Sequence, residues 1–78
     1  MFYNGVKMKV HNYLKVWRAR NDITQQQLAD AVELSRQTIN SIEKGKFVPS
    51  ILSVLKITTY FETTVEEIFF LKEDAKKQ

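Results

Sequence analysis

The chain has 78 residues, a net charge of +3, a pI near 9.3 and no cysteine. This length allows a single domain, and the lack of cysteine excludes disulfides, thiolate metal sites and cysteine nucleophiles. With neither a signal peptide nor a long apolar run, the sequence predicts a cytoplasmic protein with no membrane partner.

The positive charge is concentrated in the first two thirds of the chain. Residues 1–56 contain nine Lys and Arg against four Asp and Glu, a net +5, whereas residues 57–78 contain three against five, a net −2. This asymmetry favours an anionic partner, although ordinary solvation of a protein surface would give similar counts.

The first eight residues differ from the rest of the chain. Asn4-Gly5 is a turn signal for a hairpin, and apolar residues alternate with lysines over residues 6–10. The pattern fits a short extended arm or a disordered leader. We expect residues 1–8 to be disordered or loosely ordered.

From residue 9 onward the sequence predicts an all-α fold. Val10, Leu14 and Trp17 form an apolar stripe at i, i+4 and i+7, which indicates a first helix. The chain has only two glycines and one proline, which leaves few turn residues for strands. The predicted helices span residues 9–20, 25–32, 35–44, 50–61 and 64–71, followed by a polar tail at residues 72–78. Their expected N-cap residues are Thr24, Ser35, Ser50 and Thr64, with capping-box partners Gln27 and Glu67 for the first and last.

The second and third helices are joined by Glu33-Leu34, a connection too short for an antiparallel hairpin. The third helix must therefore leave at a steep angle, as in a helix-turn-helix. The apolar residues of this segment are expected to converge between the two helices: Leu28, Ala29, Val32, Leu34, Ile39 and Ile42.

The remaining face of the third helix is polar and carries the side-chain types that read base edges in the major groove of DNA. These residues are Arg36, Gln37, Thr38, Asn40 and Ser41. Lys44, Lys46 and the start of the second helix could hold phosphates, which position a protein without reading sequence. A plain solvated helix face is the alternative.

The segment ITQQQLADAVELSRQTINSIEKGKFVPS and the later VEEIF resemble the lambda-repressor-like, or Cro and XRE type, helix-turn-helix regulators. The resemblance extends over residues 12–70 and is closest to the short stand-alone members. It implies a compact five-helix domain over residues 9–71. It also implies a repressor, associated with the nucleoid, that binds a near-palindromic operator in double-stranded DNA as a homodimer.

The resemblance also implies roles for individual residues. Arg36, Gln37 and Ser41 would face the bases, with Thr38 and Asn40 at the edge of the groove. The phosphate contacts would be Gln25, Lys44 and Lys46. Arg18 and Glu43 would form a salt bridge that orients the third helix. The family usually has glycine at the position of Glu33, glycine or asparagine at that of Asp22, and often glycine at that of Glu62. Glu33 in a left-handed conformation would cost about 1 kcal/mol relative to glycine.

Phe69 and Phe70 cannot both be buried in one small core, so we expect a dimer interface at Ile68, Phe69 and Phe70. A singly exposed aromatic residue is the alternative. The single histidine and the lack of a metal-ligand cluster or a glycine-rich loop predict no enzyme, no catalytic residue, no metal and no cofactor. A protein-interaction module, such as an antitoxin or a regulatory subunit, remains a second functional hypothesis.

Overall fold

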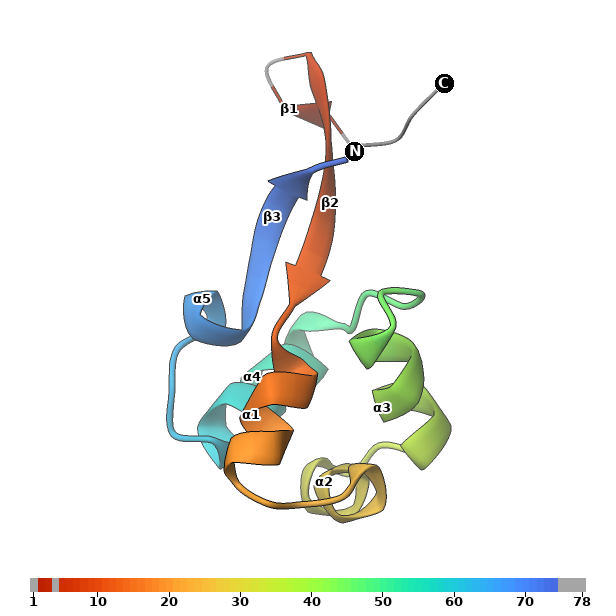
Figure 1. Ribbon diagram of the computed structural model, residues 1–78, viewed down its shortest axis with the longest axis vertical. Coiled ribbons are helices and arrows are strands. Elements are labelled where there is room, and N and C mark those ends of the chain that lie inside the picture. The colour runs from red at the N-terminus through yellow and green to blue at the C-terminus, as the bar shows by residue number, and fades with distance from the viewer. Residues whose placement is uncertain (1, 4, 75–78) are drawn as a thin grey trace.

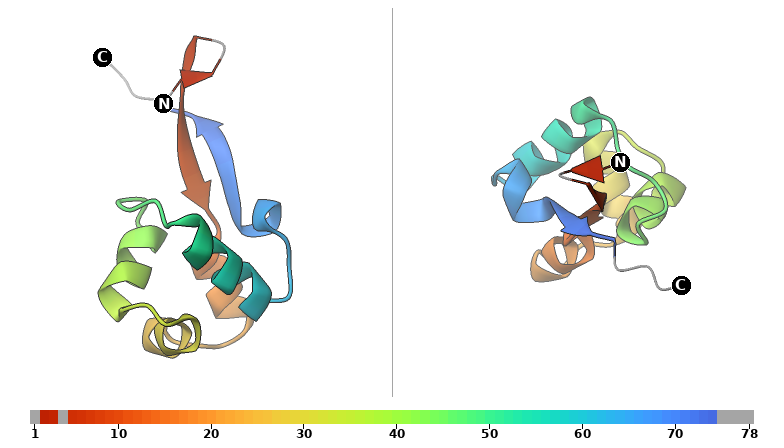
Figure 2. Two further views of the ribbon diagram at one scale, coloured as in Figure 1. Left: turned by 180° about the vertical axis from the view of Figure 1, so that it is seen from behind. Right: turned by 90° about the horizontal axis from the view of Figure 1, so that it is seen from above.

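The computed structural model describes residues 2, 3 and 5–74. Helices pack into a body from which a β-ribbon projects, and the ribbon and α2 lie at opposite ends of the long axis (Figures 1 and 2). The elements in order are β1 (Phe2–Tyr3), β2 (Val6–Asn12), α1 (Leu14–Arg20), α2 (Gln25–Val32), α3 (Arg36–Glu43), α4 (Ile51–Tyr60), α5 (Val65–Ile68) and β3 (Phe69–Glu73).

Side-chain caps set the starts of α2, α3 and α4. The hydroxyls of Thr24, Ser35 and Ser50 each accept a hydrogen bond from the backbone N–H three residues further on. Thr24 also forms the complete capping box with Gln27. These predicted caps are confirmed. Thr64 also stands at the predicted N-cap position of α5, but its side chain makes no cap hydrogen bond, so the capping box predicted with Glu67 is wrong.

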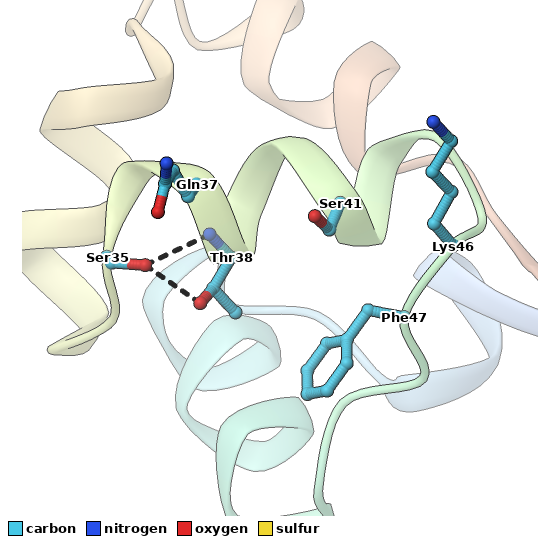
Figure 3. A pocket seen from close by; sticks show the side chains of 6 residues that line it. All are labelled: Ser35, Gln37, Thr38, Ser41, Lys46 and Phe47. Carbon is cyan, nitrogen blue, oxygen red and sulfur yellow. Dashed lines mark hydrogen bonds between the residues drawn. The ribbon is translucent and has the colours of Figure 1, made fainter.

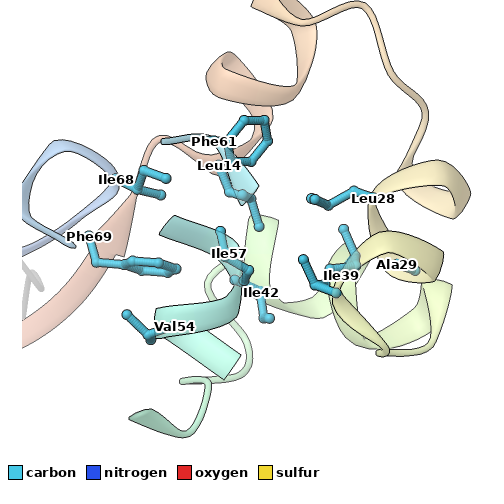
Figure 4. Packing of buried hydrophobic residues seen from close by; sticks show 11 residues of the cluster. Leu14, Leu28, Ala29, Ile39, Ile42, Val54, Ile57, Phe61, Ile68 and Phe69 are labelled. Atoms are coloured by element: carbon cyan, nitrogen blue, oxygen red, sulfur yellow. The ribbon is translucent and has the colours of Figure 1, made fainter. Parts of the chain in front are cut away.

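The core lies between the five helices and the base of the ribbon (Figure 4). Leu14, Leu28, Ile39, Ile42, Ile57 and Ile68 have no exposed surface, and Ala29, Val32, Val54, Phe61 and Phe69 complete the buried cluster. Trp17 packs against this cluster, and its Nε1 donates a hydrogen bond to the carbonyl of Glu67 at 3.1 Å. Trp17 therefore ties α1 to α5, immediately before the C-terminal strand.

The all-α prediction is wrong, because both ends of the helical body continue into strands. Residues 9–12 belong to β2 and α1 begins only at Leu14; residues 69–71 belong to β3 and α5 ends at Ile68. The two strands pair in antiparallel register from Met8↔Glu73 to Asn12↔Phe69. Their main-chain hydrogen bonds join segments near the two ends of the chain. A local hydrophobic pattern cannot predict such pairing, because the two segments are far apart in sequence.

The strand geometry also explains how two adjacent phenylalanines are accommodated. Neighbouring side chains of a strand point to opposite faces. Phe69 is therefore 7% exposed in the core, whereas Phe70 is half-buried on the other face. There Phe70 stacks on Tyr13, with ring centroids 4.7 Å apart, and on His11 at 5.8 Å.

The domain boundaries expected from the sequence fall inside strands. β2 crosses the boundary between residues 8 and 9, and β3 crosses the boundary between residues 71 and 72. β1 pairs with the start of β2 through Phe2↔Lys7 and Tyr3↔Val6, around a turn in which Gly5 has a φ of 76°. Of the residues expected to form the arm and the tail, 1, 4 and 75–78 lie outside those that the structure describes.

Candidate nucleic-acid interface

The turn between α2 and α3 sets the direction in which α3 leaves. Glu33 has a φ of 63°, a left-handed conformation, and the N–H of Leu34 donates to the carbonyl of Ala29 at 2.9 Å. Lys56 on α4 donates to Glu33 at 2.6 Å, and this hydrogen bond lowers the pKa of Glu33 below its usual value. The turn is thus tied to α4 although it lacks the glycine that such a conformation favours.

α3 buries one face and leaves the opposite face open. Ile39 and Ile42 are completely buried, which turns the polar residues of the helix outward. Arg36 and Gln37 are exposed, while Thr38, Asn40 and Ser41 are half-buried. The residues expected to read bases therefore all lie on α3, but they differ in how far they reach from it.

A hollow of about 270 Å³ lies along this outward face (Figure 3). It is bordered by the N-cap residue of α3, by three residues of the helix, and by two residues of the loop that follows. These residues are Ser35, Gln37, Thr38, Ser41, Lys46 and Phe47. Three of the predicted base-reading residues and one predicted phosphate contact thus share one concave surface.

The loop after α3 brings Lys46 to this surface. Gly45 ends the helix with a φ of 74°, and its N–H donates to the carbonyl of Ile42 at 2.9 Å. The N–H of Lys46 donates to the carbonyl of Ser41, also at 2.9 Å. The chain is therefore folded back against the end of α3, and both Lys44 and Lys46 are exposed there.

Arg18 on α1 and Glu43 at the end of α3 form the ion pair that the family resemblance implies. Arg18 Nε donates to Glu43 Oε2 at 2.7 Å and Nη2 donates to Oε1 at 3.2 Å, while Nη1 donates to the carbonyl of Ile23 at 3.0 Å. The Glu43 side chain is only 5% exposed. Its hydrogen bond to Arg18 raises the pKa of the guanidinium above its usual value, so Arg18 stays charged.

Gln25 and Asn40 extend this ion pair into a network between α1, α2 and α3. Gln25 Nε2 donates to Glu43 Oε1 at 3.0 Å and to Asn40 Oδ1 at 3.1 Å. Both amide hydrogens of Gln25 are therefore engaged within the protein, which leaves its carbonyl oxygen and the backbone at the start of α2. Asn40 accepts from Gln25 and keeps its own Nδ2 as a donor.

Two residues of the region were missed from the sequence. Asn12, at the end of β2, accepts from the N–H of Leu14 at 2.9 Å and donates to the carbonyl of Ile42 in α3 at 2.8 Å. Phe47 is 49% exposed at the edge of the hollow. A large aromatic residue directly after Lys46 in the short connector was the available signal for Phe47, whereas nothing in the sequence pairs Asn12 with α3.

The three residues expected at the dimer interface are buried or half-buried within the chain. Ile68 and Phe69 are buried inside the chain, and Phe70 is half-buried in the stack with Tyr13 and His11. Large exposed apolar side chains gather instead on α4 and the loop before it. They are Phe47, Val48, Ile51, Leu52, Leu55 and Tyr60.

Among residues 2, 3 and 5–74, no group of three or more His, Cys, Asp or Glu side chains could hold a metal ion. No helix in the same part of the chain is both long and apolar enough to cross a membrane.

Known proteins resemble this chain in sequence and in fold. A helix-turn-helix family model matches residues 14–68. An uncharacterized HTH-type transcriptional regulator of Methanocaldococcus jannaschii is 44% identical over 63 residues, covering 81% of this chain and 96% of the relative. YgzD of Bacillus subtilis, with the same description, is 43% identical with the same coverage. The crystal structure of the restriction-modification controller protein C.AhdI from Aeromonas hydrophila superposes with a TM-score of 0.65 at 26% identity, covering 69% of this chain and 82% of that protein.

Proposed function

This chain belongs to the XRE-type helix-turn-helix family of DNA-binding transcriptional regulators, and we propose that it is a sequence-specific repressor that places α3 in the major groove of double-stranded DNA. The observation that carries the proposal is the open polar face of α3, held at a fixed angle by the network of Arg18, Glu43, Gln25 and Asn40. A cytoplasmic, nucleoid-associated protein follows from this function.

Base reading falls to the most exposed side chains of α3. Gln37 and Arg36 are long and exposed, and they match the bidentate partners of adenine and guanine respectively. Ser41 and Thr38 are shorter and line the hollow, while Asn40 offers its Nδ2 from the edge of the surface. We assign Gln37 the largest share of sequence discrimination.

Phosphate contacts would surround this face. Lys44 and Lys46 follow α3, and neither α2 nor α3 carries an acidic residue in its first turn. No acidic side chain in the first turn of either helix therefore offsets the positive end of its dipole, which suits phosphate groups. At the start of α2 the backbone N–H groups would serve as donors in place of the engaged amide of Gln25.

A homodimer on a near-palindromic operator completes the proposal. Two copies would place their α3 helices in successive major grooves about 34 Å apart. The exposed apolar residues of α4 support a contact between copies, because Ile51, Leu52 and Leu55 carry no charge that would repel its own copy across a twofold axis. A single domain of this size makes few contacts with DNA, so pairing would strengthen binding.

The proposal is tested by selecting random duplex DNA with the purified protein at moderate salt and sequencing the bound pool. An inverted repeat with half-sites about one helical turn apart is the expected result. Failure to enrich any sequence, with the protein folded, would overturn the proposal.

Variants then separate reading from positioning. Gln37→Ala should relax base preference at one position of each half-site. Lys46→Ala should weaken binding to all sequences and lower the salt slope by about 1 per copy. Lys72→Ala, at the exposed ribbon, serves as the charge-matched control and should change neither. Equal losses on all sequences for Gln37→Ala would exclude base reading by that residue.

The same α4 surface is the observation behind the second candidate function, a protein-interaction module such as an antitoxin. Sedimentation of Leu52→Glu, with Leu71→Glu on the ribbon as a similarly exposed control, distinguishes the two. Loss of the dimer in Leu52→Glu alone supports the homodimer on α4. A monomeric wild-type protein without specific DNA binding would favour the second function.

A further inference from the structure

Phe47 is an unusual residue for the surface on which it lies. Its side chain is 49% exposed, whereas its neighbours around the hollow are a cap hydroxyl, an amide, two further hydroxyls and an ammonium group. Its ring points back along α3 toward the N-terminal end of the helix, away from Lys46 (Figure 3). An aromatic ring in this position adds an apolar wall to a polar face.

Thr38 adds a second apolar group to the same hollow. Its hydroxyl is 2.8 Å from the hydroxyl of Ser35, and its backbone N–H donates to the same Ser35 oxygen at 3.0 Å. Because the hydroxyl is turned to the cap, the methyl group is the part of Thr38 that remains for a ligand. The hollow therefore combines the ring of Phe47 and the methyl of Thr38 with polar groups from Gln37 and Ser41.

The edges of base pairs in the major groove offer one apolar group that fits such a surface. Hydrogen-bond donors and acceptors line the groove, and the C5-methyl group of thymine is the exception. We propose that the hollow between Phe47 and Thr38 receives the C5-methyl group of a thymine in each half-site. Gln37 and Ser41 would meet the polar edges beside it. This inference rests on the proposed function, because it requires α3 in the major groove.

In this role Phe47 is a specificity-determining residue outside α3. A contact between Phe47 and a deoxyribose would instead strengthen binding to every sequence alike. A contact between Phe47 and a second copy of the chain would change the oligomeric state. These alternatives give different outcomes in one experiment.

The experiment measures the affinity of the full chain for its selected operator by fluorescence anisotropy, with each thymine in turn replaced by uracil. Uracil keeps the hydrogen bonds of the base pair and removes only the methyl group. The wild-type protein should lose about fourfold in affinity per half-site at one position, the effect of leaving one methyl-sized group unburied. A cytosine and a 5-methylcytosine at that position then test whether a methyl on either base is accepted.

Phe47→Ala should bind the thymine operator more weakly and should no longer distinguish thymine from uracil, whereas Phe47→Leu should keep part of the difference. Leu71→Ala is the matched control, because Leu71 is a similarly exposed apolar residue (51%), lies on the ribbon and does not line the hollow. Circular dichroism and sedimentation show whether each variant is folded and dimeric.

A wild-type affinity that is unchanged by uracil at every position would overturn the inference while leaving the operator-binding function intact. An equal loss on both operators in Phe47→Ala, with the thymine-to-uracil ratio preserved, would also overturn it and indicate a sugar contact. A change in oligomeric state would indicate a contact between copies instead. If selection enriches no operator at all, the proposed function fails and the inference fails with it.

Discussion

The helical body and the β-ribbon are held together by different kinds of interaction. In the body, helices begin at N-cap hydroxyls and bury apolar side chains at helical spacing. In the ribbon, β2 and β3 join the two ends of the chain through main-chain pairing, with most side chains exposed or half-buried. The body is therefore specified by signals within each segment, whereas the ribbon forms only where two distant segments meet.

The two regions also differ in their part in DNA binding: α3 in the body would read the DNA, whereas the base of the ribbon helps to orient α3. α3 belongs wholly to the body, yet Asn12 at the end of β2 holds the carbonyl of Ile42 in its last turn. The N–H of Tyr13 donates to the carbonyl of Ile68 at 2.8 Å, where the ribbon meets the body. The ribbon thus acts on α3 through its base, and the variants below test how strongly each region depends on the other.

The largest effect is expected within the body, at the ion pair between α1 and α3. Arg18→Ala leaves the Glu43 carboxylate, 5% exposed, without its guanidinium partner. Removal of one member of a buried pair costs about 3 kcal/mol of unfolding free energy. Urea denaturation measures this loss, and Lys15→Ala, exposed on the same helix, is the control. A loss below about 1 kcal/mol would mean that solvent replaces Arg18 easily.

Phe70→Ala tests the ribbon by itself. The variant removes the ring of Phe70, which stacks on Tyr13 and His11, at an expected cost of about 2 kcal/mol of unfolding free energy. Amide hydrogen exchange should accelerate in β2 and β3 more than in α3. Leu71→Ala, at a position 51% exposed, should change little. Equal acceleration in all elements would show that ribbon and body unfold as one unit.

Asn12→Ala tests the joint between the two regions. It removes the hydrogen bond to the N–H of Leu14 and the one to the carbonyl of Ile42, for an expected loss of about 1–2 kcal/mol. Operator affinity should also fall, because the last turn of α3 loses a support. Asn21→Ala is a matched control, since its amide only donates to Trp17 within an exposed helix end. Unchanged affinity would mean that the ion pair alone orients α3.

The parts of the fold that sequence predicts are those with a local physical cause. The caps at Thr24, Ser35 and Ser50 are readable because a hydroxyl serves the N–H three residues later. The buried pair Ile39 and Ile42 can be predicted because apolar residues at i and i+3 lie on the same face of a helix. The polar face of α3 then follows as the remainder, without any knowledge of the tertiary fold.

The ribbon could not be predicted in the same way. The alternation over residues 6–10 is too short to outweigh the helical spacing of Val10, Leu14 and Trp17, which misleads because Val10 packs on the core from a strand. Phe69 and Phe70 fall within the helix predicted for residues 64–71, because only their pairing with β2 makes them part of a strand. The bond from Asn12 to Ile42 joins segments far apart in sequence, and no local pattern encodes it.

A smaller effect of opposite sign is expected where the body departs from a local preference. Asp22, Glu33 and Glu62 all have positive φ, at the positions where the resemblance implies glycine or a similar residue. Glu62→Gly should therefore raise the unfolding free energy by about 1 kcal/mol, because glycine adopts this conformation without strain. Glu66→Gly in the first turn of α5 is the control and should destabilise the protein. Thermal or urea midpoints measure both, and a destabilised Glu62→Gly would contradict the argument.

The smallest effect is expected at the surface ion pair between Glu33 and Lys56, which ties the α2–α3 turn to α4. Because the hydrogen bond from Lys56 lowers the pKa of Glu33, the folded protein holds this carboxyl ionised where the unfolded chain begins to protonate it. The stabilisation is therefore complete above the unfolded pKa and is lost as pH falls through the lower folded pKa. Glu33→Gln keeps the backbone and removes the charge, so its deficit in unfolding free energy relative to wild type should shrink as the pH falls from neutral to below the lowered pKa of Glu33. High salt should shrink it further, since the Glu33 side chain is 75% exposed. A deficit that does not change with pH would assign it to packing at the turn, because only the ionised carboxylate can attract Lys56.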